Sequence, residues 1–328
     1  MKAYFFVITP LNYLYALQGS LDKRFEFEEK HLIVLSDYNR SLKQFKIIID
    51  KKAWSSVQYP MIGSNKNSKS RIRSSLFEIY NRMSFIRLYM KITEPNSTIF
   101  WGNYNHKYSK YLKKVNNNIY FLDDGFSTIN ILKKIEKEEG KGLNEKSNYH
   151  FYTIFNIYSH KNSIIRHEFE SIFNRKYQPN LTNSIYFLGQ PLVFNNVVTE
   201  EQYVDSVNKI FGYYSKQGKT CYYIPHRSTN RNYIPKNWNV VDFNLPIEFI
   251  QLVESTKTPN YFMTFYSTGV FNLRQLYKLS NDQCIFWELP FEWLKENYRK
   301  DIESVYDYLK TNHFNVKKMM DINLEFNA

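Results

Sequence analysis

Short, continuous apolar runs alternate with segments of helical periodicity along almost the whole chain of 328 residues. Continuous apolar runs are typical of strands that are covered on both faces, as in parallel sheets. The alternation therefore predicts βαβ units. Five strands are expected in each half of the chain: Tyr4–Ile8, His31–Leu35, Val57–Ile62, Thr98–Trp101 and Ile119–Leu122, then Ile185–Leu188, Thr220–Ile224, Val240–Phe243, Tyr261–Phe265 and Cys284–Trp287.

Helical candidates lie between these strands, at Ser74–Met90, Glu200–Ser215, Ile247–Ser255 and Val270–Leu279. Residues 291–309 are expected to form a long amphipathic helix after the last strand. The two blocks of strands predict two doubly wound domains, joined at the polar, proline-containing segment 174–180. The expected domains are residues 1–180 and 181–328, with the last helix a candidate for packing back on the N-terminal domain.

Composition limits the kinds of partner. Lys and Arg total 44 against 31 Asp and Glu, and the net charge of +13 favours polyanions, which include nucleic acid, anionic lipid and phosphorylated substrates. The basic segment 65–73 is either a loop that meets such an anion or an ordinary surface loop. The two cysteines, Cys221 and Cys284, both lie in apolar runs and give no disulfide framework. The sequence also has no run of about 20 apolar residues that could form a transmembrane helix. We therefore expect a cytoplasmic protein.

Polar clusters follow several predicted strands, which is where open α/β sheets bind ligands. Asp123, Asp124 and Gly125 follow the strand 119–122. Adjacent carboxylates repel, so one of them can have the raised pKa that suits proton abstraction. The alternative is that an Asp caps the next helix.

Groups suited to binding an anion follow three strands of the second half. His226 and Arg227 follow the strand 220–224, and they can bind or protonate a phosphate unless the His is structural. Ser267, Thr268 and Gly269 precede a helix, where hydroxyls and backbone N–H groups either bind an anion or cap the helix. Glu248, just after residues 240–243, is either a ligand of ribose hydroxyls or a residue of a helical first turn.

Two further segments are expected to form loops at the mouth of a cleft. Thr9, Pro10 and Asn12 follow the first strand, and Gly189 and Gln190 follow the strand 185–188. The sequence has no Asp-x-Asp, no Walker loop and no Gly-x-Gly-x-x-Gly. A metal-bridged nucleoside diphosphate, a P-loop NTPase and a conventional dinucleotide enzyme are therefore disfavoured.

Taken in order, Asp123-Asp124-Gly125, His226 and Ser267-Thr268 resemble the acidic-acidic-Gly, His-Pro and Ser/Thr motifs of bacterial sialyltransferases. Residues 8–12, 188–192 and 246–248 also resemble segments of that family. One position departs from it, because His226 is followed by Arg227 and preceded by Pro225, where the family has His-Pro.

The resemblance implies a GT-B architecture, in which two Rossmann-like doubly wound domains face a central cleft. It implies inverting, metal-independent transfer of sialic acid from CMP-sialic acid to a hydroxyl of a bacterial surface glycan, such as lipooligosaccharide, O-antigen or capsule. Asp123 would be the general base, Asp124 would hold the turn or orient the hydroxyl, and His226 would protonate the departing phosphate. The donor would also be held by Ser267, Thr268, Gly269, Glu248, Arg227, Gly189 and Gln190, and the acceptor side of the cleft would include Thr9, Pro10, Asn12 and Gly125.

Several alternatives stay open at this point. The donor could instead be CMP-Kdo or another CMP-linked nonulosonate, such as pseudaminic or legionaminic acid. A non-catalytic scaffold and a basic nucleic-acid-binding protein are the rivals from other classes, although the aromatic residues concentrate in strands rather than among basic residues. We expect a lipid-linked oligosaccharide acceptor, peripheral contact with the anionic inner membrane, no nucleic acid and no cofactor.

Overall fold

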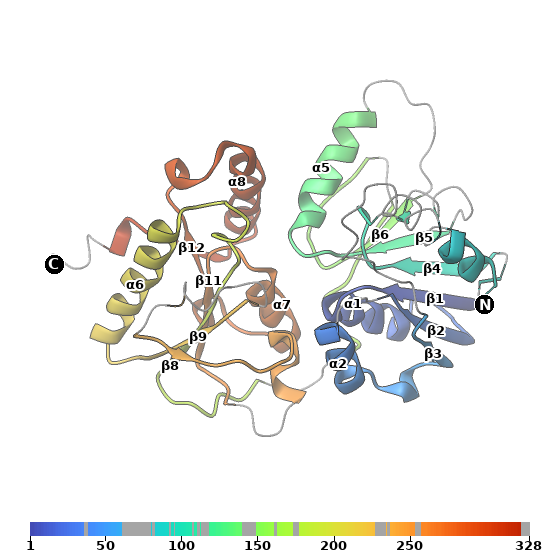
Figure 1. The fold of residues 1–328 in the computed structure, drawn as a ribbon, viewed down its shortest axis with the longest axis horizontal. Coiled ribbons are helices and arrows are strands. Elements are labelled where there is room, and N and C mark those ends of the chain that lie inside the picture. Colours follow the sequence, from blue (N-terminus) through green and yellow to red (C-terminus); the bar gives the residue numbers. More distant parts are fainter. Residues whose placement is uncertain are drawn as a thin grey trace. The chain divides into compact units, whose positions relative to one another are not determined.

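The computed structural model of the chain describes residues 1–35, 39–60, 80, 83–91, 93–94, 96–106, 108–109, 112, 118–139, 149–160, 163–172, 177–226, 234, 237–252 and 257–322. The chain divides into two compact units, Met1–Ile172 and Phe173–Ala328 (Figure 1). Each unit contains one parallel sheet with helices, so the predicted α/β fold with two Rossmann-like domains is confirmed.

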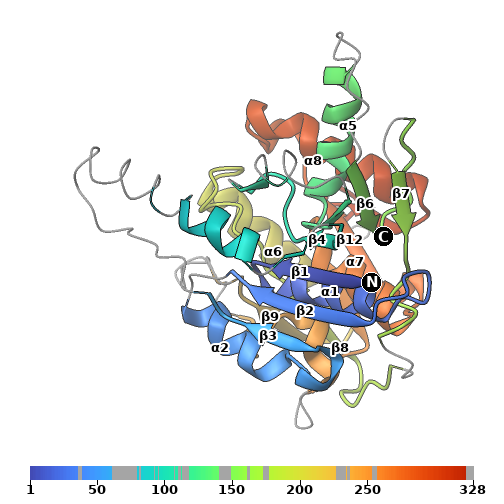
Figure 2. The same ribbon diagram turned by 90° about the vertical axis from the view of Figure 1, so that its right-hand side faces the viewer.

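The sheet of the first unit has seven strands in the order β3-β2-β1-β4-β5-β6-β7, and all neighbours are parallel (Figure 2). Its strands are β1 (Lys2–Val7), β2 (Glu29–Val34), β3 (Ser56–Gln58), β4 (Thr98–Trp101), β5 (Ile119–Leu122), β6 (Tyr149–Thr153) and β7 (Ser163–Arg166). The helices of this unit are α1 (Pro10–Leu21), α2 (Asn39–Ile48), the short η1 (Lys51–Ala53), α5 (Ser127–Glu139) and the helical residues 83–91.

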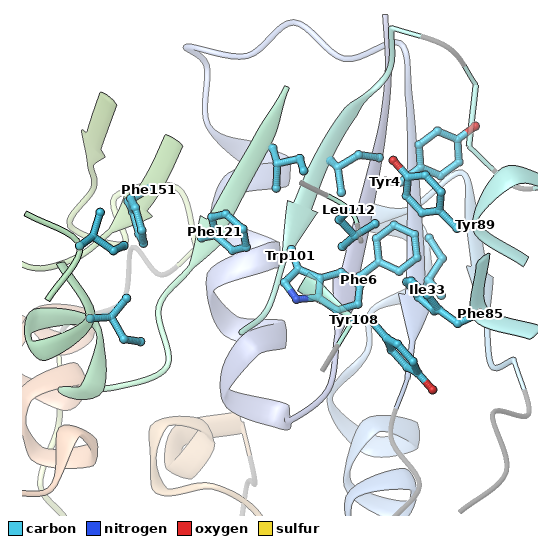
Figure 3. Close-up of a cluster of buried hydrophobic side chains, with 14 of the residues drawn as sticks. Tyr4, Phe6, Ile33, Phe85, Tyr89, Trp101, Tyr108, Leu112, Phe121 and Phe151 are labelled. Carbon is cyan, nitrogen blue, oxygen red and sulfur yellow. The ribbon is translucent and has the colours of Figure 1, made fainter. Parts of the chain in front are cut away.

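Both faces of the sheet are covered at its central strands, because successive side chains of a strand point to opposite faces and those of β1 and β4 are almost all buried. On one face Phe5 stacks on Phe100, with ring centroids 4.4 Å apart, and Gly19 lets α1 come close to them, since a β-carbon there would lie 3.2 Å from the Phe100 ring. On the other face Phe6 and Trp101 belong to a large aromatic cluster (Figure 3). Helical residues 83–91 and α5 complete that cluster.

The sheet of the second unit has six strands in the order β10-β9-β8-β11-β12-β13, again all parallel. Its strands are β8 (Ser184–Leu188), β9 (Thr220–Ile224), β10 (Asn239–Val240), β11 (Tyr261–Thr264), β12 (Cys284–Glu288) and β13 (Asn315–Lys318). Its helices are α6 (Glu200–Lys216), η3 (Ile247–Leu252), α7 (Thr268–Tyr277), η4 (Asn281–Gln283), η5 (Phe291–Trp293) and α8 (Glu296–Thr311).

Aromatic side chains cover both faces of the second sheet as well. Phe187 and Tyr223 on one face contact Trp238, with ring centroids 5.7 and 6.2 Å away. On the other face Phe262 contacts Tyr177, which also lies against Tyr277 of α7. The apolar strands thus account for both the parallel sheet and its two helical layers.

Each of the ten predicted strands overlaps an observed one, although β3 and β10 end at Gln58 and Val240, before the expected ends, and the described residues contain three more, β6, β7 and β13. β7 and β13 are edge strands, and their sequences Ser-Ile-Ile-Arg and Asn-Val-Lys-Lys are too polar to give an apolar run. The first six strands of the unit 1 sheet have the same order as the six strands of unit 2. In each sheet the chain first adds strands on one side of the first strand and then continues on its other side, so the strand order reverses between β1 and β4 and between β8 and β11. Ligand sites in open α/β sheets lie at such points.

Several expected boundaries were wrong. Residues 9–12 are not a loop, because α1 begins at Pro10 with Thr9 as its N-cap. Residues 291–309 do not form one helix, since α8 begins only at Glu296, and β13 follows it. Residues 247–252 form a 3₁₀ turn rather than an α-helix.

The contacts of α8 that the structure describes include a hydrogen bond from its Tyr306 hydroxyl to the Trp287 carbonyl oxygen at 2.9 Å, so the helix packs on the sheet of its own unit. The unit boundary at Ile172 lies before the expected one at 180. Asn180 explains the difference, because its backbone N–H donates to the Thr258 carbonyl oxygen of the second unit at 3.1 Å.

Two expectations concern the membrane. The basic segment 65–73 lies outside the described residues. Within the described part of the chain, no helix is both long and apolar enough to cross a bilayer.

Candidate active site

The carboxyl edge of the first sheet is organised by a buried amide at the start of α1. Thr9 caps this helix, its hydroxyl accepting the Asn12 N–H at 3.2 Å, while the Asn12 side-chain oxygen accepts the Thr9 N–H at 3.1 Å. Pro10 occupies the first helical turn, where its missing N–H has no helical partner to lose. Asn12 is 1% exposed, so its side chain is part of the interior rather than of the surface.

Asn12 also connects α1 to the acidic turn after β5. Its Nδ2 donates to the Asp123 carbonyl oxygen at 3.2 Å. Gly102, directly after β4, makes room for this amide, because a β-carbon there would lie 2.8 Å from Asn12 Cγ. Asn12 therefore joins the ends of β1 and β5 by hydrogen bonds and packs against the end of β4.

The Asp123 carboxylate is completely buried and holds the end of β6. Its Oδ1 accepts the Thr153 hydroxyl at 2.7 Å and its Oδ2 accepts the Ile154 N–H at 2.8 Å. Burial raises the pKa of Asp123 to about 7, and these two hydrogen bonds, which favour the ionised form, act against that rise. Neighbouring Asp124 adds a smaller repulsion that also raises the pKa.

The Asp124 carboxylate has a different environment, because this residue is partly exposed. Its Oδ2 accepts the Asn103 side-chain amide at 2.7 Å. Its backbone N–H donates to the Thr128 hydroxyl at 3.1 Å and fixes the start of α5. Gly125 follows in the left-handed region at φ +65°, which explains why a glycine closes this turn.

The two acids therefore divide into a buried carboxylate with a pKa near neutrality and a partly exposed one. A pKa of about 7 is suited to accepting a proton at neutral pH. Asp123 has no exposed surface in this structure, so a substrate reaches its oxygens only after its surroundings move.

The carboxyl edge of the second sheet is also organised by a buried amide. Gln190, 8% exposed, accepts the Tyr266 N–H at 2.8 Å and the Thr264 hydroxyl at 3.1 Å with the same side-chain oxygen. It thereby connects the end of β8 to the end of β11. The preceding Gly189 must lack a side chain, because a β-carbon would lie 2.2 Å from the Tyr223 hydroxyl oxygen.

The N-terminus of α7 lies directly after β11 and next to the end of β8. Ser267 is the N-cap, and its hydroxyl accepts the Gly269 N–H at 3.2 Å. A β-carbon on Gly269 would lie 3.0 Å from the Leu188 side chain, so the helix start contacts the end of β8. Ser267, Thr268 and Gly269 are each only partly buried. The backbone N–H groups of this first turn, with the positive end of the helix dipole, suit an anion.

Glu248 lies in η3 and is 5% exposed. Its Oε1 accepts the Asn272 side-chain amide of α7 at 2.9 Å, and its carbonyl oxygen accepts the Tyr277 hydroxyl at 2.8 Å. Burial raises the pKa of Glu248, while the bond from Asn272 lowers it. Glu248 thus fixes η3 to the helix whose N-terminus is the candidate anion site.

His226 follows β9 and Pro225 at the same edge of the second sheet, and it is partly buried. Arg227 lies outside the described residues. The residues that the resemblance assigns to the donor thus follow β8, β9 and β11, with Glu248 beside α7. Of those it assigns to the acceptor, Thr9, Asn12 and Asp123 are joined by hydrogen bonds. No group of three or more His, Cys, Asp or Glu within the described ranges is arranged to hold a metal ion.

Sequence reasoning missed several contributors to these networks, among them Gly102, Asn103, Thr153 and Tyr223. Gly102 and Asn103 directly follow a predicted strand, which is the signal that selected the other candidates. Thr153 is the last residue of β6, a strand that the sequence did not predict. Tyr223 lies inside β9, where nothing in the sequence distinguishes it from an ordinary apolar strand residue.

Comparison with known proteins supports the fold alone. No family model matches the chain, and no curated protein matches it in sequence. Solved structures do match. The complex of TcCGT1 with UDP has a TM-score of 0.56 at 7% identity, and Arabidopsis thaliana UGT89C1 with UDP-L-rhamnose has 0.53 at 8%; each comparison covers 97% of this chain and 85% of the other.

A sialyltransferase from Photobacterium damselae, residues 113–497 corresponding to its GT-B domain, matches with a TM-score of 0.50 at 13% identity, over 97% of this chain and 98% of that one. Together these similarities show that the chain has the GT-B fold of glycosyltransferases.

Proposed function

We propose that the chain is an inverting, metal-independent glycosyltransferase that moves sialic acid from CMP-sialic acid to a hydroxyl of a bacterial surface glycan. The observation that carries this proposal is the first turn of α7. Its backbone N–H groups and the hydroxyls of Ser267 and Thr268 lie where the strand order reverses, and they suit a single phosphate. A CMP-linked sugar carries one phosphate, which such neutral donors can stabilise as it leaves.

The second unit would bind the donor. His226 would protonate or hydrogen-bond the departing CMP phosphate, and Arg227 would add a positive charge to it. Glu248 would hold the ribose hydroxyls once donor binding gives access to its carboxylate, which is buried and accepts the Asn272 amide. Gly189 and Gln190 would support the site from the end of β8, since the Gln190 oxygen is already bound to β11 and Tyr266.

The first unit would activate the acceptor. Asp123 would take the proton of the acceptor hydroxyl, as its pKa of about 7 allows, once acceptor binding gives access to its buried oxygens. Asp124, the partly exposed acid, would orient that hydroxyl, and Gly125 would keep the turn. Thr9, Pro10 and Asn12 would hold this edge in place rather than touch the sugar, because Asn12 is buried and hydrogen-bonded.

The positive net charge of +13 and the basic segment 65–73 lead us to propose a lipid-linked acceptor at an anionic membrane. Binding of the protein to vesicles with and without anionic lipid, at low and moderate salt, tests this part. Equal binding to both vesicle types would contradict it.

The donor test is a panel of nucleotide sugars incubated with the protein and lipooligosaccharide. CMP-sialic acid, CMP-Kdo, CMP-pseudaminic acid and CMP-legionaminic acid represent the proposed class. UDP-glucose and UDP-rhamnose represent the donor type in the UGT89C1 structure. We expect CMP release and sugar transfer with CMP-sialic acid, unchanged in EDTA.

Each of the other outcomes leads to a different conclusion. Transfer from CMP-Kdo or another CMP-nonulosonate alone would keep the mechanism and replace the sugar. Transfer from a UDP-sugar alone, or activity that EDTA removes and Mg²⁺ restores, would overturn the proposal. Retardation of single-stranded oligonucleotides at moderate salt, without any transfer, would favour a nucleic-acid-binding protein.

A further inference from the structure

Asp124 is the partly exposed member of the acidic pair, and the Asn103 side chain contacts its carboxylate. The Asn103 amide donates to Asp124 Oδ2 at 2.7 Å, a short contact of the kind that an ionised acceptor makes. Asn103 lies two residues after β4, whereas Asp124 follows β5, so the bond bridges two adjacent strand ends.

Asn103 is itself firmly fixed. Its side-chain oxygen accepts the Asn105 N–H at 2.8 Å, which leaves the amide NH₂ turned toward Asp124. Its carbonyl oxygen accepts both the Trp101 indole N–H and the Ser109 hydroxyl, each at 2.8 Å. Trp101 is fully buried in the aromatic cluster (Figure 3). The hydrogen bond from its indole N–H therefore fixes the Asn103 backbone against the core of the unit.

We propose that Asn103 is a positioning residue of the acceptor site, which orients the Asp124 carboxylate toward the acceptor hydroxyl. This inference rests on the proposed transferase function. The buried Asp123 needs no such partner, because Thr153 and Ile154 hold it from β6. A carboxylate that must meet a substrate in one orientation benefits from being held in advance, and the Asn103 amide holds the partly exposed Asp124 carboxylate through this bond.

The test separates orientation from mere structural support. Asn103→Ala should lower kcat/KM for the acceptor about 10- to 100-fold, as loss of a hydrogen bond to a charged group does. The KM for the donor and the slow, acceptor-independent hydrolysis of the donor should stay within about twofold of wild type. Donor hydrolysis needs no acceptor orientation, whereas general damage to the unit would change both rates.

The reciprocal double substitution Asn103→Asp/Asp124→Asn is the matched control. It keeps an amide and a carboxylate in contact but exchanges their positions, so the stability lost in the single variants should return in urea unfolding. Transfer should not return, because the carboxylate now stands at the end of β4.

Two results would overturn the inference: recovery of transfer together with stability in the double variant, or an unchanged acceptor kcat/KM in Asn103→Ala. If the wild-type protein uses a UDP-sugar, the same comparison is made with that donor, so a wrong donor and a wrong role for Asn103 give different results.

Discussion

The two units share a strand order but present opposite chemistry at their carboxyl edges. In each, a glycine after a central strand makes room for a buried polar group, Asn12 beside Gly102 and Tyr223 beside Gly189. In each, a buried carboxamide ties separate strand ends together. The first unit then presents two carboxylates, and the second a helix N-terminus with hydroxyls. The same strand order can therefore carry either acidic side chains or a helix N-terminus with hydroxyls, depending on which residues follow its strands.

The largest expected effect concerns the acid of the first unit. Asp123→Asn should reduce transfer to background, a loss of about 10⁴-fold at the upper end of what a general base contributes. Its amide nitrogen would either oppose the Ile154 N–H, donor against donor, or face the Thr153 hydroxyl, which would then have to turn away and find another acceptor, so stability should also fall by about 1–3 kcal/mol. CMP release and urea unfolding measure the two effects, and near-wild-type transfer would refute the assignment of the base.

The second effect concerns the imidazole of the other unit. His226→Ala should lower turnover about 10²–10⁴-fold, since it removes the group that stabilises the leaving phosphate. His313→Asn, at an exposed position with φ +58° that asparagine tolerates, is the control and should leave turnover unchanged. An equal loss in both variants would show that the effect is not specific to the site.

The glycine pair tests whether the two edges are built alike. Gly102→Ala should displace Asn12, and Gly189→Ala should displace Tyr223, each with a stability loss of about 1–3 kcal/mol. Gly102→Ala should mainly reduce acceptor use, and Gly189→Ala should mainly raise the donor KM. Gly212→Ala in α6, where a β-carbon meets nothing within 4 Å, should instead be neutral or stabilise by up to about 1 kcal/mol. The same donor KM in all three variants would contradict the division of roles.

The last effect is a pH dependence specific to the first unit. Asp123 has a folded-state pKa raised to about 7, above its unfolded value, so its protonated form favours folding. Relative to Asp123→Asn, the unfolding free energy of the wild type should fall between about pH 4 and 7, by at most about 1.4 kcal/mol per pH unit, and be level above. Transfer should rise over the upper part of that range. A pH-independent difference between the two proteins would contradict the raised pKa.

The sequence predicted the architecture well because the central strands are apolar on both faces, as in Phe-Phe-Val of β1 and Tyr-Phe-Leu of β8. It could not predict the polar edge strands, nor that α1 begins at Pro10, since Thr9–Asn12 has the composition of a turn as well as of a cap. Nor could it show that Asp123 is the buried acid and Asp124 the exposed one. That difference depends on Thr153 and Asn103, which are distant in sequence and are brought together only by the order of strands.

The central claim is that the second unit binds a cytidylate with its phosphate at the start of α7. A crystal structure of the protein soaked with CMP tests it most directly. The account predicts the phosphate on the backbone N–H groups and hydroxyls of Ser267 to Gly269, the ribose near Glu248 and the His226 ring within hydrogen-bond distance of a phosphate oxygen. CMP bound at another place, or no CMP bound at a saturating concentration where UDP occupies the site, would contradict it.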